Sequence, residues 1–411
     1  MMIATSRPRI AINERILLFA MFGVMSLSGI VFIEPAPYDI ALLAVGTFAL
    51  LFGLRIPAKF APLLFCSTLI IIFGFVASLY STRITEAAMH IVTTAYLIVG
   101  TVILAAFIAA MPLRAISAVM NGYIVAALIA TLAGLVGYFD LIPGAYDLFT
   151  LYGRLSGTFK DPNVFGPFLI APLLFLIFQF TTKPGKYLPV QLGVALILTA
   201  GIFLSFSRGA WGHLVVSGLV LLPMILVVLP NNISRFRLLF FALLALVSLA
   251  LFLLLLLGSS SISEMFTQRA QLTQAYDAGG RGRFDGQKLA LEWVLSSPLG
   301  TGWGDFARYW GEQAHNVYIS QFMFSGWVGG FAYIALIIAT LIRGFVYIRY
   351  NLATRPYLMV FLATFCGLIL QGFVIDTDHW RHFYLVIAAI WGLTAAPWNR
   401  QEVERNSGRL T

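Results

Sequence analysis

Arginines and one histidine are the side chains of this sequence best suited to chemistry. Arg208 lies in the segment Ser205 to Ala210, while Arg281 and Arg283 lie in a glycine-rich stretch. A guanidinium is always charged and presents a fork of donors that matches phosphate oxygens. His315 stands directly before a long apolar run, and the ordinary pKa of histidine, about 6.5, suits proton transfer at neutral pH. These residue types predict a site that holds a phosphate-bearing ligand and removes a proton.

Four further polar residues are candidates for substrate binding: Arg154, Lys160, Asn163 and Asn316. The first three stand close together in the sequence, and the fourth directly follows the histidine. The turn Asp161-Pro-Asn also has a simpler interpretation, because such a turn starts a helix.

The principal candidates have structural interpretations as well. Arg208 could snorkel towards ordinary lipid headgroups, and Arg281 and Arg283 could belong to a solvated basic loop. A histidine beside an apolar run, such as His315, is more often a hydrogen-bonded structural residue. Residue type and placement alone leave these alternatives open.

The rest of the chain predicts a membrane scaffold. Of its 411 residues 60% are hydrophobic and 10% are charged, whereas a soluble chain of this length carries about 25% charged residues. Apolar runs long enough to cross a bilayer recur, and helices satisfy their own backbone hydrogen bonds in lipid. The sequence therefore predicts an all-α polytopic membrane protein. About twelve spans are expected, at 15–33, 38–54, 61–80, 90–110, 115–139, 163–181, 188–206, 210–230, 238–257, 316–342, 356–375 and 382–397.

Basic residues concentrate in short loops and tails on one side of these spans, which the positive-inside rule assigns to the cytoplasm. Both termini are then cytoplasmic, and residues 1–411 form a single membrane domain. The net charge of +9 reflects this topology rather than nucleic-acid binding. Ionisable residues within the spans cluster near outer ends, which weighs against an ion-coupled transporter.

A polar stretch at 258–315 is the longest interruption of the apolar pattern and is predicted to be an outer loop between the ninth and tenth spans. Phe284, Leu291 and Leu295 fall near one face of a helix-like run within it. That pattern is typical of an interfacial amphipathic helix. A turn from Pro298 to Gly302 follows the run.

No metal site is expected. Cys66 and Cys366 each lie inside a predicted span, where a buried, reduced cysteine is the ordinary interpretation and no disulfide framework is implied. Another outer segment contains His379, Arg381 and His382, but no spacing there assigns a role.

Five short segments resemble the O-antigen ligase and polymerase superfamily of bacterial envelope glycosyltransferases. They follow the order of that family over roughly 150–330: Arg154 to Asn163, Ser205 to Ala210, Arg283 at a fixed distance before Pro298, Pro298 to Gly302, and His315 to Tyr318. Each segment is weakly specific alone, whereas five in order on one predicted face of the membrane are fairly specific.

The resemblance implies a C-type glycosyltransferase architecture in the bacterial inner membrane, with interfacial helices in a periplasmic loop and the active site on that face. It implies a donor glycan carried on undecaprenyl diphosphate, without a cofactor or a required metal. The acceptor is lipid A–core for a ligase, or a second lipid-linked unit for an O-antigen or exopolysaccharide polymerase.

By the same resemblance, Arg208 and Arg283 match diphosphate-binding arginines, and His315 matches the histidine that activates the acceptor. Arg281 has no firm counterpart, so either arginine of the glycine-rich stretch could be the functional one. Transfer is expected to proceed with inversion at the anomeric carbon.

Two other functions stay open. A flippase or exporter of lipid-linked oligosaccharides would need a charged central cavity, for which the sequence shows no row of intramembrane charges. A non-catalytic scaffold of a polysaccharide assembly complex is the third hypothesis. The sequence does not separate ligase from polymerase, and it does not identify the sugars or the oligomeric state.

Overall fold

The chain is an all-α polytopic membrane protein. A computed structural model describes residues 13–182, 184–229, 260–270, 282–350 and 353–396, with isolated positions between 232 and 240. Within them the helices are joined by loops and by one small hairpin, β1 (Thr150–Leu151) with β2 (Arg154–Leu155). The helices group into two compact units.

Among the described residues, six helices are long and apolar enough to cross a membrane: Ala58–Ser78, Ile84–Ala110, Pro112–Tyr138, Pro162–Thr182, Arg208–Val227 and Val317–Tyr347. Four apolar helices in the same residues are shorter: Pro37–Leu51, Leu188–Leu204, Arg355–Gln371 and Arg381–Ala395. Every predicted span except one overlaps a helix, although 15–33 extends beyond Glu14–Ser26 and 163–181 covers both Pro162–Phe168 and Ile170–Thr182. The exception, 238–257, lies almost wholly outside the described residues.

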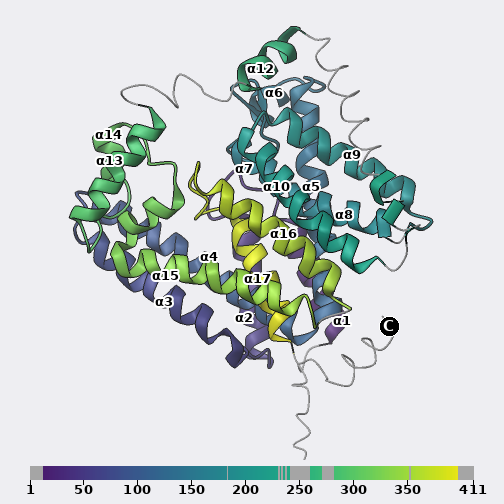
Figure 1. The fold of residues 1–411 in the computed structure, drawn as a ribbon, viewed down its shortest axis with the longest axis horizontal. Coiled ribbons are helices and arrows are strands. Elements are labelled where there is room, and N and C mark those ends of the chain that lie inside the picture. The colour runs from purple at the N-terminus through teal and green to yellow at the C-terminus, as the bar shows by residue number, and fades with distance from the viewer. Residues whose placement is uncertain are drawn as a thin grey trace, which may run out of the picture. The chain divides into compact units, whose positions relative to one another are not determined.

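The first unit takes its residues from 1–126, 286–362 and 372–406. Helix α15 (Val317–Tyr347) packs along α3 (Ala61–Ser78), and α17 (Arg381–Ala395) packs along α4 (Ile84–Ala110) (Figure 1). The other described helices that lie wholly in this unit are α1 (Glu14–Ser26), α2 (Pro37–Leu51), the short η1 (Ala58–Phe60) and α14 (Asp305–Trp310). Small residues allow these helices to approach closely. A Cβ on Gly74 of α3, for example, would lie 2.6 Å from a side-chain carbon of Ile91 on α4.

The second unit takes its residues from 127–285 and 363–371. Its helices are α6 (Ala145–Phe149), α7 (Pro162–Phe168), α8 (Ile170–Thr182), α9 (Leu188–Leu204), α10 (Arg208–Val228) and α12 (Ser260–Ala270). Helix α8 packs on α9, and α7 packs on α10. Helices α5 (Pro112–Tyr138), α13 (Arg283–Ser296) and α16 (Arg355–Gln371) contribute residues to both units.

The later part of the polar stretch folds over the beginning of α15. Helix α13 and the short α14 (Asp305–Trp310) form an apolar cluster with α15, made of Ala290, Val294, Phe306, Ala314, Met323 and Phe324. On α13 the predicted apolar face of Phe284, Leu291 and Leu295 is exposed, whereas Gly286, Ala290 and Val294 are buried. The small residues therefore pack on the protein, and the large apolar ones face outwards.

The turn from Pro298 to Gly302 fits into a kink of α15. Ser325 and Gly326 leave the helical conformation there, which frees backbone groups that must find other partners. The turn supplies them: Thr301 N and Gly302 N donate to Met323 O at 2.9 and 3.1 Å, and Trp327 N donates to Pro298 O at 2.8 Å. This sequence motif therefore fixes the shape of α15 just beyond its first turns.

Candidate functional site

Arg154 lies at the end of a two-residue hairpin turn in the second unit. Tyr152 and Gly153 both have positive φ, 52° and 69°, which matches the twist of the paired strands. The side chain of Arg154 is 5% exposed. Its Nε donates to Ser205 O at 2.8 Å, and its Nη2 donates to Asn163 Oδ1 at 2.8 Å. One buried guanidinium thus ties together two of the segments that the sequence singled out.

Asn163 stands at the start of α7. Asp161 caps this helix by accepting from Asn163 N at 2.7 Å, with Pro162 in the first helical turn, as expected of an N-cap carboxylate. The helix-starting interpretation of this turn is therefore confirmed. Lys160, directly before the cap, is exposed.

The segment Phe206 to Arg208 forms the beginning of α10 and is termed the α10 entrance. Phe206 has φ 45°, a left-handed conformation that costs energy for a bulky residue. Ser207 is the N-cap and its hydroxyl accepts from Ala210 N at 3.3 Å. Arg208 is the first helical residue and is half-buried. Its charge therefore lies at the positive end of the helix dipole, where two sources of positive potential add.

Two glycines allow the neighbouring segments to approach the α10 entrance. A Cβ on Gly166 of α7 would lie 2.7 Å from the Ala210 side chain and 2.9 Å from Ser205 Oγ. Gly157 has φ 58°, and a Cβ there would lie 2.5 Å from Ala130 O. Larger residues would push these segments apart, so both positions support the geometry around Arg154 and Arg208.

His315 and Asn316 form the beginning of α15, termed the α15 entrance. His315 has φ 50°, a conformation in which the backbone stores strain. Asn316 is buried and is the N-cap, with Oδ1 accepting from Tyr318 N at 3.1 Å and Ile319 N at 3.3 Å. The amide oxygen of Asn316 is thus used by the helix.

The imidazole of His315 lies between two carboxylates. Its Nδ1 is 4.0 Å from Asp376 Oδ2, and its Nε2 is 3.6 Å from Glu312 Oε2. The side chain is 31% exposed, so a ligand can reach it. Ser320 donates its hydroxyl to Asp376 Oδ1 at 2.6 Å, which fixes the orientation of that carboxylate. A partly exposed histidine with a fixed carboxylate close to one ring nitrogen has the elements of a general base.

Hydrogen bonds to backbone carbonyls hold the α15 entrance against the segment that follows α16. Gln287 donates from Nε2 to His315 O and to Phe373 O, both at 3.3 Å. Val317 N donates to Gly372 O at 2.9 Å. These contacts explain how Asp376, distant in sequence, stays beside the histidine.

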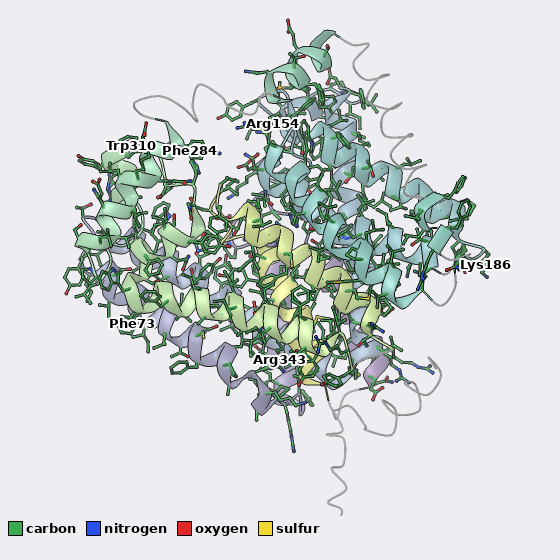
Figure 2. All side chains as sticks on the ribbon, viewed as in Figure 1. Phe73, Arg154, Lys186, Phe284, Trp310 and Arg343 are labelled. Carbon is green, nitrogen blue, oxygen red and sulfur yellow. The ribbon has the colours of Figure 1, made fainter. Side chains whose placement is uncertain are left out.

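The other predicted arginines belong to the polar stretch. Arg283 is half-buried and begins α13, whereas Arg281 lies outside the described residues. The structure thus brings Arg154, Asn163 and the α10 entrance together in one unit, and it places His315 and Asn316 in the other. In Figure 2, Arg154 and Lys186 lie at opposite ends of the second unit. Trp310 and Arg343 lie at opposite ends of the first unit.

Asp376 and Gln287 contact the α15 entrance, and the sequence analysis assigned neither of them a role. Asp376 belongs to a polar segment that was predicted to lie on the outer side, but its separation from His315 carries no periodic signal. The only signal in that segment was the presence of a carboxylate, which commonly accompanies a histidine base.

One comparison with known proteins identifies a family. The family model described as O-antigen ligase matches residues 193–334. This range contains Arg208, Arg283 and His315, together with α13 and α14, whereas Arg154 precedes it. No curated protein matches the chain.

Proposed function

From the O-antigen ligase domain that this chain contains at residues 193–334, we propose a membrane glycosyltransferase that moves a glycan from undecaprenyl diphosphate to an acceptor glycan. The membrane helices and the family match make it an enzyme of the ligase and polymerase type in polysaccharide synthesis. The single observation that carries the proposal is that one match spans both principal arginines and His315.

Donor binding is assigned to cations at helix beginnings. Diphosphate is a competent leaving group whose developing negative charge needs fixed positive charge. Arg208 supplies it together with the N-terminal end of α10. Arg283 is the second diphosphate ligand, and Arg281 is the alternative for that role. No nucleotide sugar is needed, because the donor arrives already activated.

His315 is assigned the role of general base. We assign the ring proton to Nδ1, beside the Asp376 carboxylate that Ser320 orients. Glu312 lies 3.6 Å from Nε2, but it is 45% exposed and solvent screens its charge. The lone pair of Nε2 then accepts the proton of the substrate. The acceptor hydroxyl loses its proton to Nε2 and its oxygen forms a bond to the anomeric carbon. The bond from that carbon to the diphosphate oxygen breaks, and attack from the opposite face inverts the anomeric centre. This step needs no metal, because the arginines neutralise the leaving group.

Arg154 and Asn163 are assigned a supporting role. Arg154 donates to the carbonyl of Ser205, three residues before Arg208, so it holds the turn that presents Arg208. Lys160 and the amide nitrogen of Asn316 are further candidates for sugar or phosphate contacts.

The site is placed on the periplasmic face of the inner membrane, with both termini cytoplasmic. The stretch 258–315 is then a periplasmic loop of a single membrane domain. The exposed apolar residues of α13, Phe284, Leu291 and Leu295, suit contact with the lipid surface.

The test is complementation of a strain that lacks the protein. His315→Ala and Arg208→Ala should each abolish the polymeric glycan while the protein still reaches the membrane in normal amount. Arg83→Ala serves as the matched control, because Arg83 is an exposed arginine that pairs with Glu86, three residues further along the chain. Near-normal glycan from either site variant would contradict the proposal.

The glycan profile of the deletion strain separates the acceptors. Lipid A–core carrying single repeats indicates a missing polymerase, whereas uncapped core with accumulated lipid-linked polymer indicates a missing ligase. If lipid-linked sugar crosses the bilayer of reconstituted vesicles and no new glycosidic bond forms, the protein is a flippase and the proposed enzyme function is wrong.

A further inference from the structure

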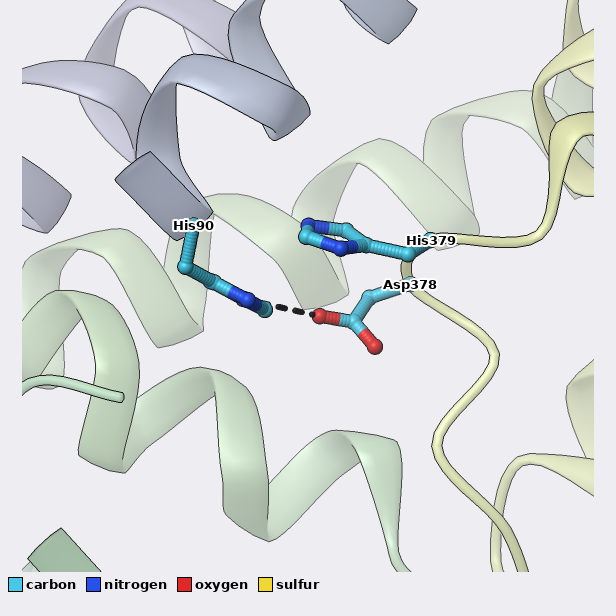
Figure 3. Close-up of side chains that lie close together, drawn as sticks. All are labelled: His90, Asp378 and His379. Carbon is cyan, nitrogen blue, oxygen red and sulfur yellow. Dashed lines mark ion pairs between the residues drawn. The ribbon is translucent and has the colours of Figure 1, made fainter. Parts of the chain in front are cut away.

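Two histidines and an aspartate form a buried cluster in the first unit. His90 comes from α4, while Asp378 and His379 come from the turn before α17. Figure 3 shows the three side chains pointing toward one another. One nitrogen of each histidine and one carboxylate oxygen all lie within 4.8 Å of one another. The side chains of His90 and Asp378 are 9% and 6% exposed.

The separations approach those of a metal-ligand set. Zinc binds imidazole nitrogen and carboxylate oxygen at about 2.0–2.2 Å, so two ligands of a tetrahedral site lie about 3.3 Å apart. His90 Nε2 and Asp378 Oδ2 are 3.3 Å apart. The three ligand atoms lie within 4.8 Å of one another, so the wider pairs must close by up to about 1.5 Å to complete the set. The rings of His90 and His379 are stacked with centroids 4.0 Å apart, so one ring must turn for both lone pairs to meet the same ion.

Hydrogen bonds from Thr94 and Gln321 orient the side chains of the cluster. Thr94 donates its hydroxyl to His90 O at 3.2 Å and lies 3.0 Å from His379 Nε2. Because the Thr94 hydroxyl donates its proton to His90 O, its oxygen acts as the acceptor for the N–H at Nε2 of His379. The lone pair of the His379 ring is then on Nδ1. Gln321 donates from Nε2 to Asp378 Oδ2 at 3.1 Å. Partners of this kind orient the ligands in protein metal sites.

His90 Nε2 and Asp378 Oδ2 form a close pair at 3.3 Å. An ion replaces the proton between these two atoms, because a metal ligand must be deprotonated and metal binding releases protons.

We propose that His90, Asp378 and His379 bind one divalent transition-metal ion, zinc by the nature of the ligands, which ties α4 to the turn before α17. Two imidazoles and a carboxylate make three ligands and leave a fourth position for water. The ion is separate from the transfer step, and the inference does not rest on the proposed function. The bound ion stabilises the turn from Asp376 to Trp380, and this turn contains Asp376, the carboxylate beside His315.

A direct test measures zinc in the full-length protein purified in detergent. After incubation with zinc and removal of the excess, mass spectrometry of the metal should find about one equivalent per chain. Replacing zinc by Co²⁺ should give the visible absorption of a tetrahedral site. A wild-type protein that retains no zinc and shows no such absorption with cobalt overturns the proposal, since the cluster is then a hydrogen-bonded His–Asp pair only.

Variants locate the ion. His379→Gln and His90→Gln should each weaken zinc binding at least about 100-fold, and Thr94→Val, which leaves all three ligands in place, about 10-fold. His315→Gln is the control, because this partly exposed histidine is not in the cluster; its zinc content should equal that of the wild type. Undiminished zinc in His379→Gln and His90→Gln also overturns the assignment. If those two fail to fold, Thr94→Val and the cobalt spectrum of the wild type decide.

Discussion

The α10 and α15 entrances use the same backbone device for opposite chemistry. Each has a residue with left-handed φ, then a capping side chain, then the helix: Phe206 before Ser207, and His315 before Asn316. At the α10 entrance the side chain proposed to bind the donor, Arg208, follows the cap. At the α15 entrance it precedes the cap, so His315 itself adopts the strained conformation.

The surroundings of the two entrances differ in charge. Arg154 donates to the carbonyl of Ser205, directly before the α10 entrance, and so brings a second cation to this segment. Glu312 and Asp376, by contrast, flank His315. A positive helix beginning attracts an anion, while carboxylates favour proton transfer to histidine. The comparison teaches that one helix-capping geometry can present either an anion-binding cation or a base, depending on which side of the cap the residue stands.

Removing the base should have the largest effect. His315→Gln keeps the size of the side chain but cannot accept the proton, so the transfer rate should fall about 10²–10⁴-fold. The measurement is the initial rate of polymer formation from purified lipid-linked donor. A loss below about 5-fold would remove His315 from the role of base.

The two carboxylates beside His315 should not be equivalent. Asp376→Asn should lower the rate about 10–100-fold, because Ser320 orients Asp376 and its charge lies beside Nδ1. Glu312→Gln should change the rate less than about 3-fold, because Glu312 is 45% exposed and its charge is screened by solvent. Equal losses in the paired rate assays would contradict this assignment of the nitrogens.

Arg154 should affect both stability and rate. Arg154→Met leaves Ser205 O and Asn163 Oδ1 without their donors, which should destabilise the protein by about 2–4 kcal/mol and slow transfer about 10-fold. Arg154→Lys should not restore either property, because an ammonium cannot reproduce the two-pronged geometry. Heating followed by size-exclusion chromatography measures the stability, and full rescue by Lys would show that charge alone suffices.

The turn that fits into the kink of α15 should affect the stability of the protein and not the chemistry of the transfer. Gly300 and Gly144 have φ 80° and 79°, but only at Gly300 would a Cβ meet backbone, at 2.7 Å from Met323 O. Gly300→Ala should therefore cost about 2–4 kcal/mol, and the matched control Gly144→Ala about 1 kcal/mol. Equal melting temperatures of the two variants would show that the kink does not depend on this close approach.

Sequence patterns predicted the helices well because lipid exposure imposes long apolar runs. Helix α13 was also predictable, since Phe284, Leu291 and Leu295 recur at helical spacing and are exposed on it. The candidate residues for chemistry followed from side-chain type and from the family resemblance. The match at 193–334 confirms the resemblance, whereas the roles of the residues stay predictions.

Tertiary pairings could not be predicted in the same way. Asp376 meets His315, and His379 meets His90, only because α15, α4 and the turn before α17 pack together. No spacing in the sequence encodes such a meeting. The left-handed φ of Phe206 and His315 was equally hidden, because neither residue type requires it.

The central claim is that Arg208 holds the donor while His315 acts only in the transfer. Equilibrium binding of an undecaprenyl-diphosphate-linked glycan to purified variants tests it most directly, with the transfer rate measured on the same samples. Arg208→Gln should weaken donor binding at least about 10-fold. His315→Gln should bind the donor within about 2-fold of the wild type while its transfer rate falls at least about 100-fold. Unchanged donor binding by Arg208→Gln, or a parallel loss of binding and rate in His315→Gln, would contradict the account.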